Sequence, residues 1–502
     1  MEVSLFAWLV SSKSSPIFLA AKETSILGSL FLAGLTTSIL VYRAAFHRLN
    51  RFPGPFAARL SNMYPTMLSA RKLQLYEEVD SLHKTYGDFV RVGPSELSIN
   101  HPGAMTAIHS AQSRCSKGPW YNVLHPRVSL HMVRDKTEHA RRRRVWDRGF
   151  SSKALRDYEP RVKKYTDQLL EHIEATKGMS INVTDWFNYY SFDVMGDLAF
   201  GKSFGMLASG TTHYFMKALH ADMTNIGLFS HALWLFPLFK ITPVLNAEHI
   251  KFWRWLGVQV DERKQMKPDR PDVFSWLLAD HEAQQPITKQ AEMDLVGDAS
   301  LIVVAGSDTT AASLTALFFE LALHKEEMKQ VQEEVDQYFE QNPAADAHSL
   351  SKLSYLDAVI NEALRLHPPV PSGVQRFTPP EGIQIGSVFV PGETIIQVPL
   401  HTAFRDERNF ARPDEFVPER WTTKPELTIN AVTYAPFSIG PYSCVGKQLG
   451  LMEMRYVAAE IVRKYDIALA PGQTPKAFLD GKRDTFTLAL GPLNLLFTDR
   501  KV

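Results

Sequence analysis

Apolar residues recur every three or four positions along much of this chain, which is the spacing of one face of an α-helix. From about Thr137 to His367 this pattern predicts a long series of helices. One more helix is predicted after Cys444, where the apolar positions share one face: Leu449, Met452, Tyr456 and Ala459. Helices therefore dominate the predicted structure.

Alternating apolar and polar residues predict only a few short strands. Asp88–Val92 and Glu96–Ile99 flank a Gly-Pro pair and predict an early hairpin. Two short strands are expected near Gln384–Ile385 and Ser387–Val390. A final hairpin is expected over Thr485–Thr498, around Gly491-Pro492.

The amino-terminal region carries a long apolar segment. From Thr24 to Tyr42 there are 19 residues without a charge, and a helix of that length spans about 30 Å, the thickness of the hydrocarbon core of a bilayer. A cleaved signal peptide is the alternative. The first charge, however, is the acidic Glu2, and the apolar run is longer than such peptides need.

Charges on the two sides of this segment predict its orientation. Arg43, Arg48 and Arg51 follow it, whereas Lys13, Lys22 and Glu23 precede it. Because positive charges favour the cytoplasmic side, we expect the carboxyl side of the segment to be cytoplasmic.

These features divide the chain into three parts. Residues 1–42 are expected to form a lumenal tail and a transmembrane anchor, with the span at about 24–42. Residues 43–59 form a basic, proline-rich linker that includes the rigid sequence Phe52–Pro55. No long linker divides residues 60–502, so we expect one large domain, mainly α with minor β.

Composition excludes several classes of protein. Hydrophobic residues make up 45% of the 502 residues and charged residues 22%, which suits a large packed core and not a disordered chain. The 55 Lys and Arg nearly balance the 54 Asp and Glu, so we expect no nucleic-acid partner. The two cysteines, Cys115 and Cys444, are too few for a disulfide framework or a zinc site of several cysteines.

One segment matches the pattern of a phosphate-binding loop, G-x-x-x-x-G-K-(S/T). It covers Gly196–Ser203. Such a loop should follow a buried strand, but Trp186–Met195 before it has helical spacing and the interior of the segment is apolar. We therefore expect part of the core here and no nucleotide site.

Cys444 has the strongest chemical signal. It follows a Gly/Pro-rich loop and opens the predicted last helix, whose amino end carries partial positive charge. A cysteine in that position is shifted towards the thiolate, the form that ligates metals. Gly440 and Gly446 allow the backbone to approach a large flat group. A buried structural cysteine is the alternative, and Cys115 has no comparable setting.

The segment around Cys444 resembles the haem-binding signature of the cytochrome P-450 family, F-x-x-G-x-(R/H)-x-C-x-G. Phe437, Gly440, Cys444 and Gly446 match it. The resemblance implies the family's fold, a single large helical domain with small β-sheets, and a haem b (iron protoporphyrin IX) whose axial ligand is the Cys444 thiolate. Tyr442 departs from the signature, because the family usually places Arg or His there to pair with a haem propionate.

Two further motifs resemble the family's E-x-x-R and F-x-P-E-R-(F/W). Glu362 and Arg365 stand three residues apart and therefore share a helix face. Arg420 lies in the second motif. The resemblance implies that these three residues form a structural triad beside the cysteine loop. A surface ion pair of little stabilising value is the alternative.

The sequence Ala305–Thr310 lies within a helical pattern and resembles the family's (A/G)-G-x-(D/E)-T. A glycine in a helix costs about 1 kcal/mol relative to alanine, so a kink or a solvated turn is the alternative. The resemblance implies that Gly306 opens the helix for O2 and that Asp308 and Thr309 are catalytic, because they deliver protons.

Residues 138–144 form a basic run. Counted back from Phe150, His139 and Arg143 occupy the places of the family's W-x-x-x-R, with His in place of Trp. The resemblance implies that both contact the haem propionates, together with Arg376. The cations left for an acidic electron donor are Arg141, Arg142, Arg144 and Lys447. A solvated basic face is the alternative.

The resemblance implies a membrane-bound haem monooxygenase similar to fungal enzymes of secondary metabolism. Such an enzyme inserts one atom of O2 into a small apolar organic substrate, with electrons from NADPH-cytochrome reductase. A single-pass anchor in the endoplasmic reticulum membrane would contact lipid and leave the catalytic domain in the cytosol. By family position the substrate pocket includes Ala305, Val374 and Gln375.

Two other functions remain open from the sequence. A haem-thiolate isomerase or dehydratase would need no external electrons, and a non-catalytic haem-binding protein would need only the cysteine. Asp308 and Thr309 favour the monooxygenase, because the non-catalytic protein needs neither.

Overall fold

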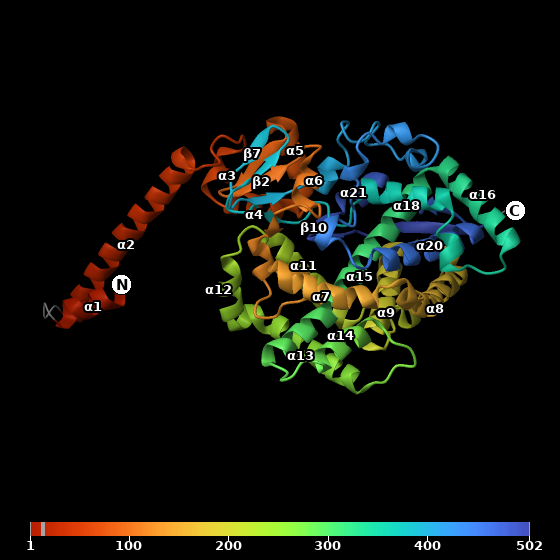
Figure 1. Ribbon diagram of the computed structural model, residues 1–502, viewed down its shortest axis with the longest axis horizontal. Coiled ribbons are helices and arrows are strands. Elements are labelled where there is room, and N and C mark those ends of the chain that lie inside the picture. The colour runs from red at the N-terminus through yellow and green to blue at the C-terminus, as the bar shows by residue number, and fades with distance from the viewer. Residues whose placement is uncertain (1, 12–15, 501–502) are drawn as a thin grey trace.

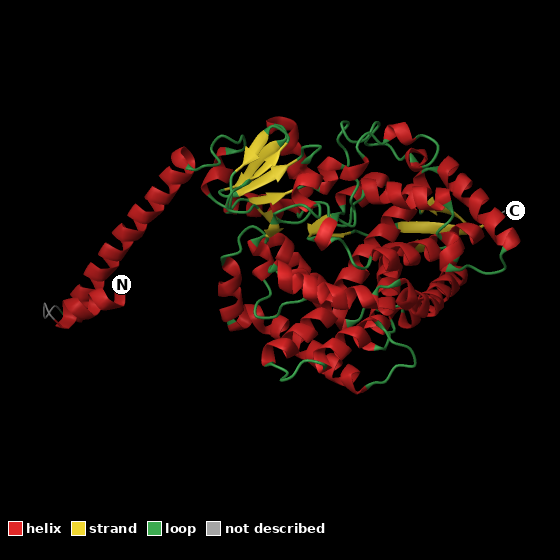
Figure 2. Ribbon diagram, in the orientation of Figure 1, coloured by secondary structure: helices red, strands yellow, loops and turns green. Residues whose placement is uncertain are grey.

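The computed structural model describes residues 2–11 and 16–500, so that Lys13 lies outside the described residues. A mainly helical body carries several small sheets, and a long helix projects from it at the amino end (Figure 1 and Figure 2). The prediction of a mainly α fold with minor β is confirmed.

Helices make up most of the described chain. Their bounds are α1 (Glu2–Ser11), α2 (Ile17–Val41), α3 (Phe56–Leu60), α4 (Met63–Lys72), α5 (Leu75–Tyr86), α6 (Ala104–His109), α7 (Lys136–Gly149), α8 (Ser152–Thr176), α9 (Val183–Phe200), α10 (Met206–Ser209) and α11 (Tyr214–Phe229). They continue with α12 (Leu235–Ile241), α13 (Pro243–Gln265), α14 (Val273–Glu282), α15 (Lys289–Leu323), α16 (Lys325–Gln341), α17 (Ala347–Leu350), α18 (Ser354–Leu366), α19 (Leu400–Ala403), α20 (Lys447–Lys464) and α21 (Pro475–Asp480).

Helix α15, with 35 residues, runs through the body (Figure 1). Helix α9 packs along it, and α18 and α20 also contact it. Leu295, Ile302 and Leu317 are among its many buried residues. A helix enclosed in this way is apolar around most of its circumference, which explains why α15 is apolar enough to span a membrane although it lies mostly inside the protein.

Strands are short and lie in small sheets. Their bounds are β1 (Phe89–Gly93), β2 (Glu96–Ile99), β3 (Ser116–Lys117), β4 (Ser180–Asn182), β5 (Arg376–Phe377), β6 (Ile383–Ile385), β7 (Val388–Val390), β8 (Ile395–Gln397), β9 (Tyr465–Leu469), β10 (Arg483–Thr485), β11 (Thr487–Ala489) and β12 (Asn494–Asp499).

The largest sheet has the strand order β1-β2-β8-β5-β3. Strands β2 and β8 are parallel, and the other neighbours are antiparallel. The β1–β2 hairpin and the β6–β7 pair confirm the strands predicted in those regions. Because β3 and β5 pair, the sheet places Lys117 directly opposite Arg376.

The hairpin predicted around Gly491-Pro492 is wrong. Strand β11 pairs with β10 before it, and β12 pairs with β4 and β9 instead. Pro492 has no N–H and cannot continue a ladder, so the chain leaves one sheet at this point and enters another.

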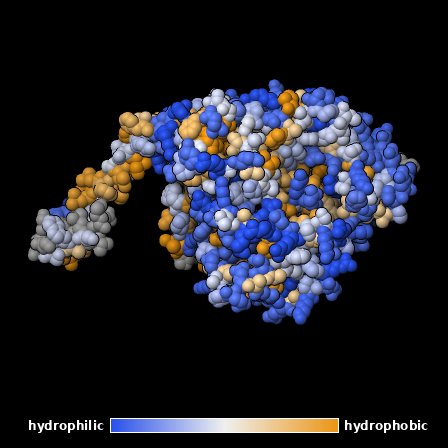
Figure 3. All heavy atoms as spheres, in the orientation of Figure 1, coloured by the Kyte–Doolittle hydropathy of each residue, from blue (hydrophilic) through white to orange (hydrophobic). Residues whose placement is uncertain are grey.

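The amino-terminal apolar helix is longer than the predicted span of 24–42. Helix α2 begins at Ile17 and continues as a π-helical turn over Tyr42–Phe46. Large apolar side chains on it are exposed, and Figure 3 shows apolar atoms along it outside the body. By length and composition, Ile17–Phe46 could cross a membrane.

Part of the predicted linker 43–59 packs against the body. Leu49 and Phe52 are buried in the apolar cluster that includes residues of β1, β2 and β8. The Arg91 backbone N–H donates to Pro53 O at 2.8 Å, and Arg91 Nη1 donates to Asn50 Oδ1 at 2.5 Å. The packed body therefore begins before residue 60, because these apolar side chains are removed from water there.

The segment Gly196–Ser203 is the end of α9 and the turn that follows. Gly201 has a left-handed conformation at the helix end, and Leu198, Ala199 and Phe200 are buried. The glycine therefore ends a helix and does not cradle a phosphate, as the helical spacing predicts.

Candidate functional site

Cys444 lies in a tight loop before α20. The Cys444 backbone N–H donates to Phe437 O at 2.8 Å, and the Ser443 N–H donates to Gly440 O at 3.0 Å. Gly440 has a φ of 71°, and a Cβ atom there would clash with the His109 carbonyl oxygen, so the loop requires glycine. Because α20 begins at Lys447, Cys444 precedes the helix by almost one turn instead of opening it.

Opposing effects act on the Cys444 thiol. It is accessible to solvent, yet protein surrounds it closely enough that burial raises its pKa, while the Gly446 N–H, the Arg143 charge and Lys447 lower that pKa. The net pKa is raised. A metal cation bound at the sulfur would favour the thiolate, since coordinating thiols are deprotonated.

Cys444 belongs to no metal-binding cluster of protein side chains in the described part of the chain. Within residues 2–11 and 16–500, no three His, Cys, Asp or Glu side chains are placed to hold a metal ion together. A metal at Cys444 therefore needs further ligands from a prosthetic group. An iron porphyrin with a cysteine axial ligand meets this requirement.

Three basic side chains surround Tyr442 in the same loop. Lys117 Nζ and the Arg376 guanidinium carbon each lie 4.9 Å from the centre of the Tyr442 ring. The His139 ring is 4.7 Å away, edge to face. Lys117, Arg376 and His139 are all buried, so the loop beside Cys444 contains a dense group of basic side chains.

This group lacks a counter-charge. Lys117 Nζ donates only to backbone carbonyls, and Arg376 Nη1 donates to the Tyr121 hydroxyl and to a carbonyl. The Arg376 Nε and the Tyr442 hydroxyl are buried without a partner. In the described part of the chain no carboxylate hydrogen-bonds to Lys117 or Arg376, although buried charges are normally paired.

The pKa values in the group reflect burial and repulsion between its basic side chains. Burial lowers the pKa of Lys117 to about 6, with further lowering by Arg376, Arg142 and Arg143. Burial and the charges of Lys117 and Arg143 lower the pKa of His139 to about 3. A ligand with two carboxylates would relieve this repulsion. The residues present therefore fit the two propionates of a haem.

Lys117 is a basic residue of this site that the sequence did not reveal. No motif surrounds it, and its place next to Arg376 follows from the β3–β5 pairing. Arg376 and His139, predicted from the resemblance, lie in the same group. Arg143 lies at its edge, donating from Nη1 to Ser443 O at 2.6 Å and pairing with Asp147 through Nε.

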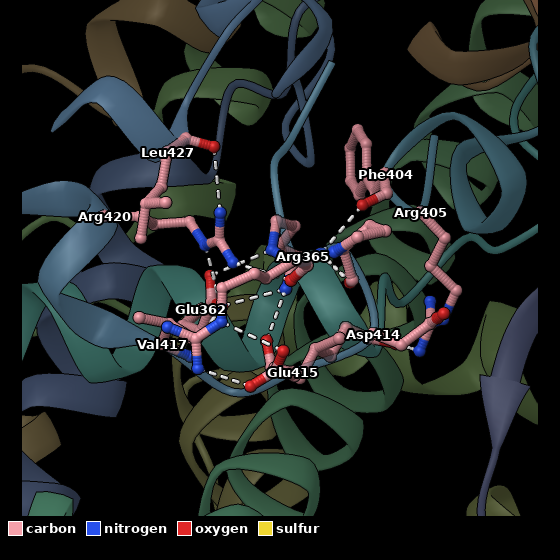
Figure 4. Close-up of polar contacts among 12 residues, drawn as sticks. Glu362, Arg365, Phe404, Arg405, Asp414, Glu415, Val417, Arg420 and Leu427 are labelled. Carbon is pink, nitrogen blue, oxygen red and sulfur yellow. Dashed lines mark hydrogen bonds and ion pairs between the residues drawn. The ribbon is translucent and has the colours of Figure 1, made fainter. Parts of the chain in front are cut away.

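A buried network lies between α18 and the turn Pro418–Trp421, which precedes Cys444 in the chain (Figure 4). It consists of Glu362, Arg365 and Arg420. Arg365 donates to both Glu362 oxygens at 2.8 and 2.9 Å, and Arg420 Nε donates to Glu362 Oε1 at 2.9 Å. The Trp421 indole N–H also donates to Glu362, at 3.0 Å. Both arginines donate to several backbone carbonyls: those of Phe404, Ala411, Arg412, Pro413, Glu415 and Leu427.

The middle of α15 has an accessible side. Ala305 is exposed and Thr309 partly exposed, although most of the helix is buried. One residue further on, the Thr310 hydroxyl lies against Gly450 of α20, at 3.7 Å from an added Cβ. The predicted catalytic turn therefore passes close to the helix that follows Cys444. The Thr309 hydroxyl donates to Ala305 O at 2.7 Å.

The Asp308 side chain points towards α11. It is buried, and its Oδ1 lies 3.0 Å from Nε2 of His220 on α11. The structure thus brings Asp308 together with a histidine that sequence reasoning missed, and does not join its carboxylate to Thr309 by a hydrogen bond. No local pattern marks His220, because its partner lies 88 residues away.

The sequence predicted that Gly306 opens the helix, but the structure shows no opening there. Helix α15 is continuous there, and a Cβ at Gly306 would lie 2.6 Å from the Met195 sulfur. The glycine therefore permits close packing between α15 and α9.

The remaining predicted positions lie on nearby loops and strands. Gln375 is buried, and its Oε1 has no partner, while Val374 is half-buried. Arg142 is not free for an electron donor, because it is buried and pairs with Asp298 at 2.5 Å. Lys447 is exposed above the Phe437 ring.

Comparisons with known proteins show the family of this chain. The profile of a family described as Cytochrome P450 matches residues 53–497. The chain is 56% identical over 469 residues to "Cytochrome P450 monooxygenase FCK2" of Fusarium pseudograminearum, covering 93% of this chain and 85% of that protein.

Two further relatives are also fungal. "Cytochrome P450 monooxygenase orf5" of Eupenicillium brefeldianum is 49% identical over 471 residues, covering 93% of this chain and 95% of the relative. "Tryprostatin B 6-hydroxylase" of Aspergillus fumigatus is 39% identical over 482 residues, covering 95% of this chain and 86% of the relative.

Proposed function

Since this chain belongs to the cytochrome P-450 family as a monooxygenase, we propose that it is a membrane-anchored enzyme which inserts one atom of O2 into an apolar organic substrate. Enzymes of this family use a haem-thiolate cofactor, O2 and a redox partner. We propose haem b as the cofactor and NADPH-cytochrome reductase as the electron donor.

The uncompensated cations beside Cys444 carry this proposal. Cys444 would ligate the iron, Lys117, Arg376 and His139 would face the propionates, and Arg143 would hold the cysteine loop through Ser443 O. Phe437, Gly440 and Gly446 shape the loop. When bound, the haem supplies the iron centre at which O2 is activated with two electrons.

Thr309 and Asp308 are proposed to manage protons. The Thr309 hydroxyl is accessible from the open side of α15. Its proton is directed at Ala305 O, to which the hydroxyl donates a hydrogen bond. Asp308 lies one residue away, on the buried side, and can accept a proton from His220. Carboxylates and hydroxyls that exchange protons at the reacting centre act as general acids and bases.

The substrate is proposed to be a small, apolar product of fungal secondary metabolism that is hydroxylated. One relative is named as a hydroxylase of tryprostatin B. Ala305, Val374 and Gln375 would contact the substrate. The triad of Glu362, Arg365 and Arg420 would keep the fold intact and would not contact the substrate.

The amino-terminal helix is proposed to anchor the enzyme in the endoplasmic reticulum membrane by a single pass. Residues 1–42 would comprise the lumenal tail and anchor, residues 43–59 a connection that packs in part against the body, and residues 60–502 the rest of the catalytic domain in the cytosol. The exposed apolar surface of α2 supports the anchor. The arginines that follow this helix support the cytosolic orientation of the catalytic domain.

Spectroscopy and turnover together test the function. Reduced protein with CO should show the red-shifted Soret band of thiolate ligation, and Cys444→Ala should abolish that band. Reductase, NADPH and O2 should convert a substrate found in a spectral binding screen of terpenoids, alkaloids and fatty acids. Product formed without external electrons would instead indicate an isomerase or dehydratase, and retention of the band by Cys444→Ala would contradict the ligand assignment.

A further inference from the structure

Helices α11 and α15 are joined by a pair of ionisable side chains, His220 and Asp308. His220 Nε2 lies 3.0 Å from Asp308 Oδ1. The side chain of Asp308 is 7% exposed, whereas that of His220 is 41% exposed. The pair therefore connects a buried carboxylate in the middle of α15 with a position that solvent reaches.

A cavity of about 130 Å³ borders this pair. Asp308 and His220 both line it, together with the hydroxyl groups of Thr224 on α11 and of Thr184, Thr485 and Thr487 on three other elements. Its volume and its polar partners suit several water molecules. An acid and an imidazole beside a chain of hydroxyls and waters have the composition of a proton path.

Asp308 is the only charged group that shifts the pKa of His220. Burial lowers the pKa of His220, but the hydrogen bond and the charge of Asp308 outweigh burial and raise it. Charged groups on the neighbouring elements are engaged elsewhere: Asp222 pairs with His249 of α13 at 2.9 Å, and Asp484 of β10 accepts a hydrogen bond from Ser372.

We propose that His220 is a positioning residue for Asp308 and the point at which protons enter from the cavity. This inference rests on the proposed function. The imidazolium gives its Nε2 proton to Asp308 Oδ1, so that an N–H bond breaks and an O–H bond forms. The neutral imidazole then regains a proton from a hydronium ion in the cavity, which becomes water. Asp308 passes its proton to water on the Thr309 side of α15.

Exposure distinguishes this pair from a structural ion pair. Arg263 and Asp272, for example, pair at 2.7 Å with both side chains almost fully buried. His220 instead stays open to the cavity. A residue that must be recharged once per proton requires that access.

The test compares His220→Gln with His249→Gln in the haem-loaded enzyme. Glutamine keeps a hydrogen-bonding group at either place but cannot titrate. His249 of α13 is a matched control, because it pairs with Asp222 of α11, the helix that carries His220, and not with Asp308. Product and hydrogen peroxide formed per NADPH would be measured across pH.

In the wild-type enzyme, we expect the product per NADPH to fall as the pH rises through the pKa of His220, because the imidazolium is lost. His220→Gln should remove this dependence and lower the product rate by roughly tenfold, within the range that partners of a functional group contribute. His249→Gln should behave like the wild type. An unchanged pH profile in His220→Gln, or the same loss in both variants, would overturn the proposal.

A second measurement does not depend on turnover. The imidazole signal of His220 would be titrated by NMR in the reduced, CO-bound protein. Asp308→Asn should lower the pKa of His220, and an unchanged value would overturn the pairing. Thr224→Val, which removes a hydroxyl from the cavity wall, should also lower the product rate if His220→Gln does not fold. If the wild-type enzyme forms no product from NADPH and O2, the proposed function is rejected. The NMR titration would still show whether His220 and Asp308 are paired.

Discussion

Lys117 and Arg376 lie opposite each other on antiparallel strands β3 and β5, and the cationic end of each lies 4.9 Å from the centre of the Tyr442 ring. Like charges directly across a sheet are destabilising. Here Tyr442 replaces the basic residue that the family's signature usually has. The structure therefore shows a basic side chain on β3, Lys117, beside this position of the cysteine loop.

Lys117→Met should weaken haem retention and stabilise the protein without haem. The pKa of Lys117 in the folded chain is about 6, well below its usual 10.5, so the unfolded chain binds the extra proton between these values. The stability of the haem-free protein should therefore rise with pH across this window, by up to about 1.4 kcal/mol per pH unit. Urea unfolding at several pH values would measure the slope. Lys117→Met should reduce it without removing it, because burial also lowers the pKa of Lys482, to about 7. A slope that is unchanged by the substitution would contradict the burial of an uncompensated charge.

Arg143→Ala should lose haem faster than Tyr442→Phe. Arg143 holds Ser443 O at 2.6 Å next to Cys444, whereas the Tyr442 hydroxyl has no partner and its ring alone contacts the cations. Tyr442→Ala removes that ring, which is worth about 0.5–2 kcal/mol to a nearby cation, and should fall between the two. Transfer of haem to apomyoglobin would give the rates. Faster loss from Tyr442→Phe than from Arg143→Ala would reject this ranking.

Glu362→Ala should prevent accumulation of folded, haem-loaded protein. The substitution leaves two buried arginines without their carboxylate, and such losses cost about 3–5 kcal/mol. Glu415→Gln is the control, because its side chain pairs with Arg412 at the surface, where ion pairs contribute about 0–1 kcal/mol. Expression yield and the CO-difference spectrum would compare them. A haem-loaded Glu362→Ala enzyme with a changed product pattern would show a role in substrate binding instead.

Thr309→Ala should keep haem, substrate binding and NADPH consumption but divert electrons to hydrogen peroxide. Loss of a general acid lowers product formation by on the order of 10²-fold. Asp308→Asn should slow turnover with less diversion. Ser307→Ala serves as the control, because Ser307 is buried against α9. Product and peroxide would be measured together, and unchanged coupling in Thr309→Ala would place the proton supply elsewhere.

Removal of residues 1–41 should release a folded body from membranes on carbonate extraction, or leave it held only by its surface. Removal of residues 1–55 should destabilise the body, because it deletes the buried Leu49 and Phe52, each worth about 1.5–3 kcal/mol. Thermal unfolding of the two truncated proteins would compare them. Equal stability would mean that this segment does not belong to the body. Protease treatment of intact microsomes should digest the catalytic domain, and protection would reverse the proposed orientation.

Several features of the fold were predictable because they depend on neighbours in the chain. The spacing of apolar residues predicted the helices around α15 and α20, and the Gly-Pro turn predicted the β1–β2 hairpin. Glu362 and Arg365 share a helix face by their spacing alone. The segment around Gly491-Pro492 failed this test, because β12 finds its partners in β4 and β9, far away in the sequence.

The sequence by itself determined the family and the mainly helical class, and it singled out Cys444 as the candidate iron ligand, because each rests on short motifs or on local periodicity. Only the tertiary structure decided that Lys117 meets Arg376 and that His220 meets Asp308. It also decided that Arg142 pairs with Asp298 and that Gly306 packs against Met195. These partners are brought together by strand pairing and helix packing, and such long-range contacts leave no spacing in the chain from which they could be inferred.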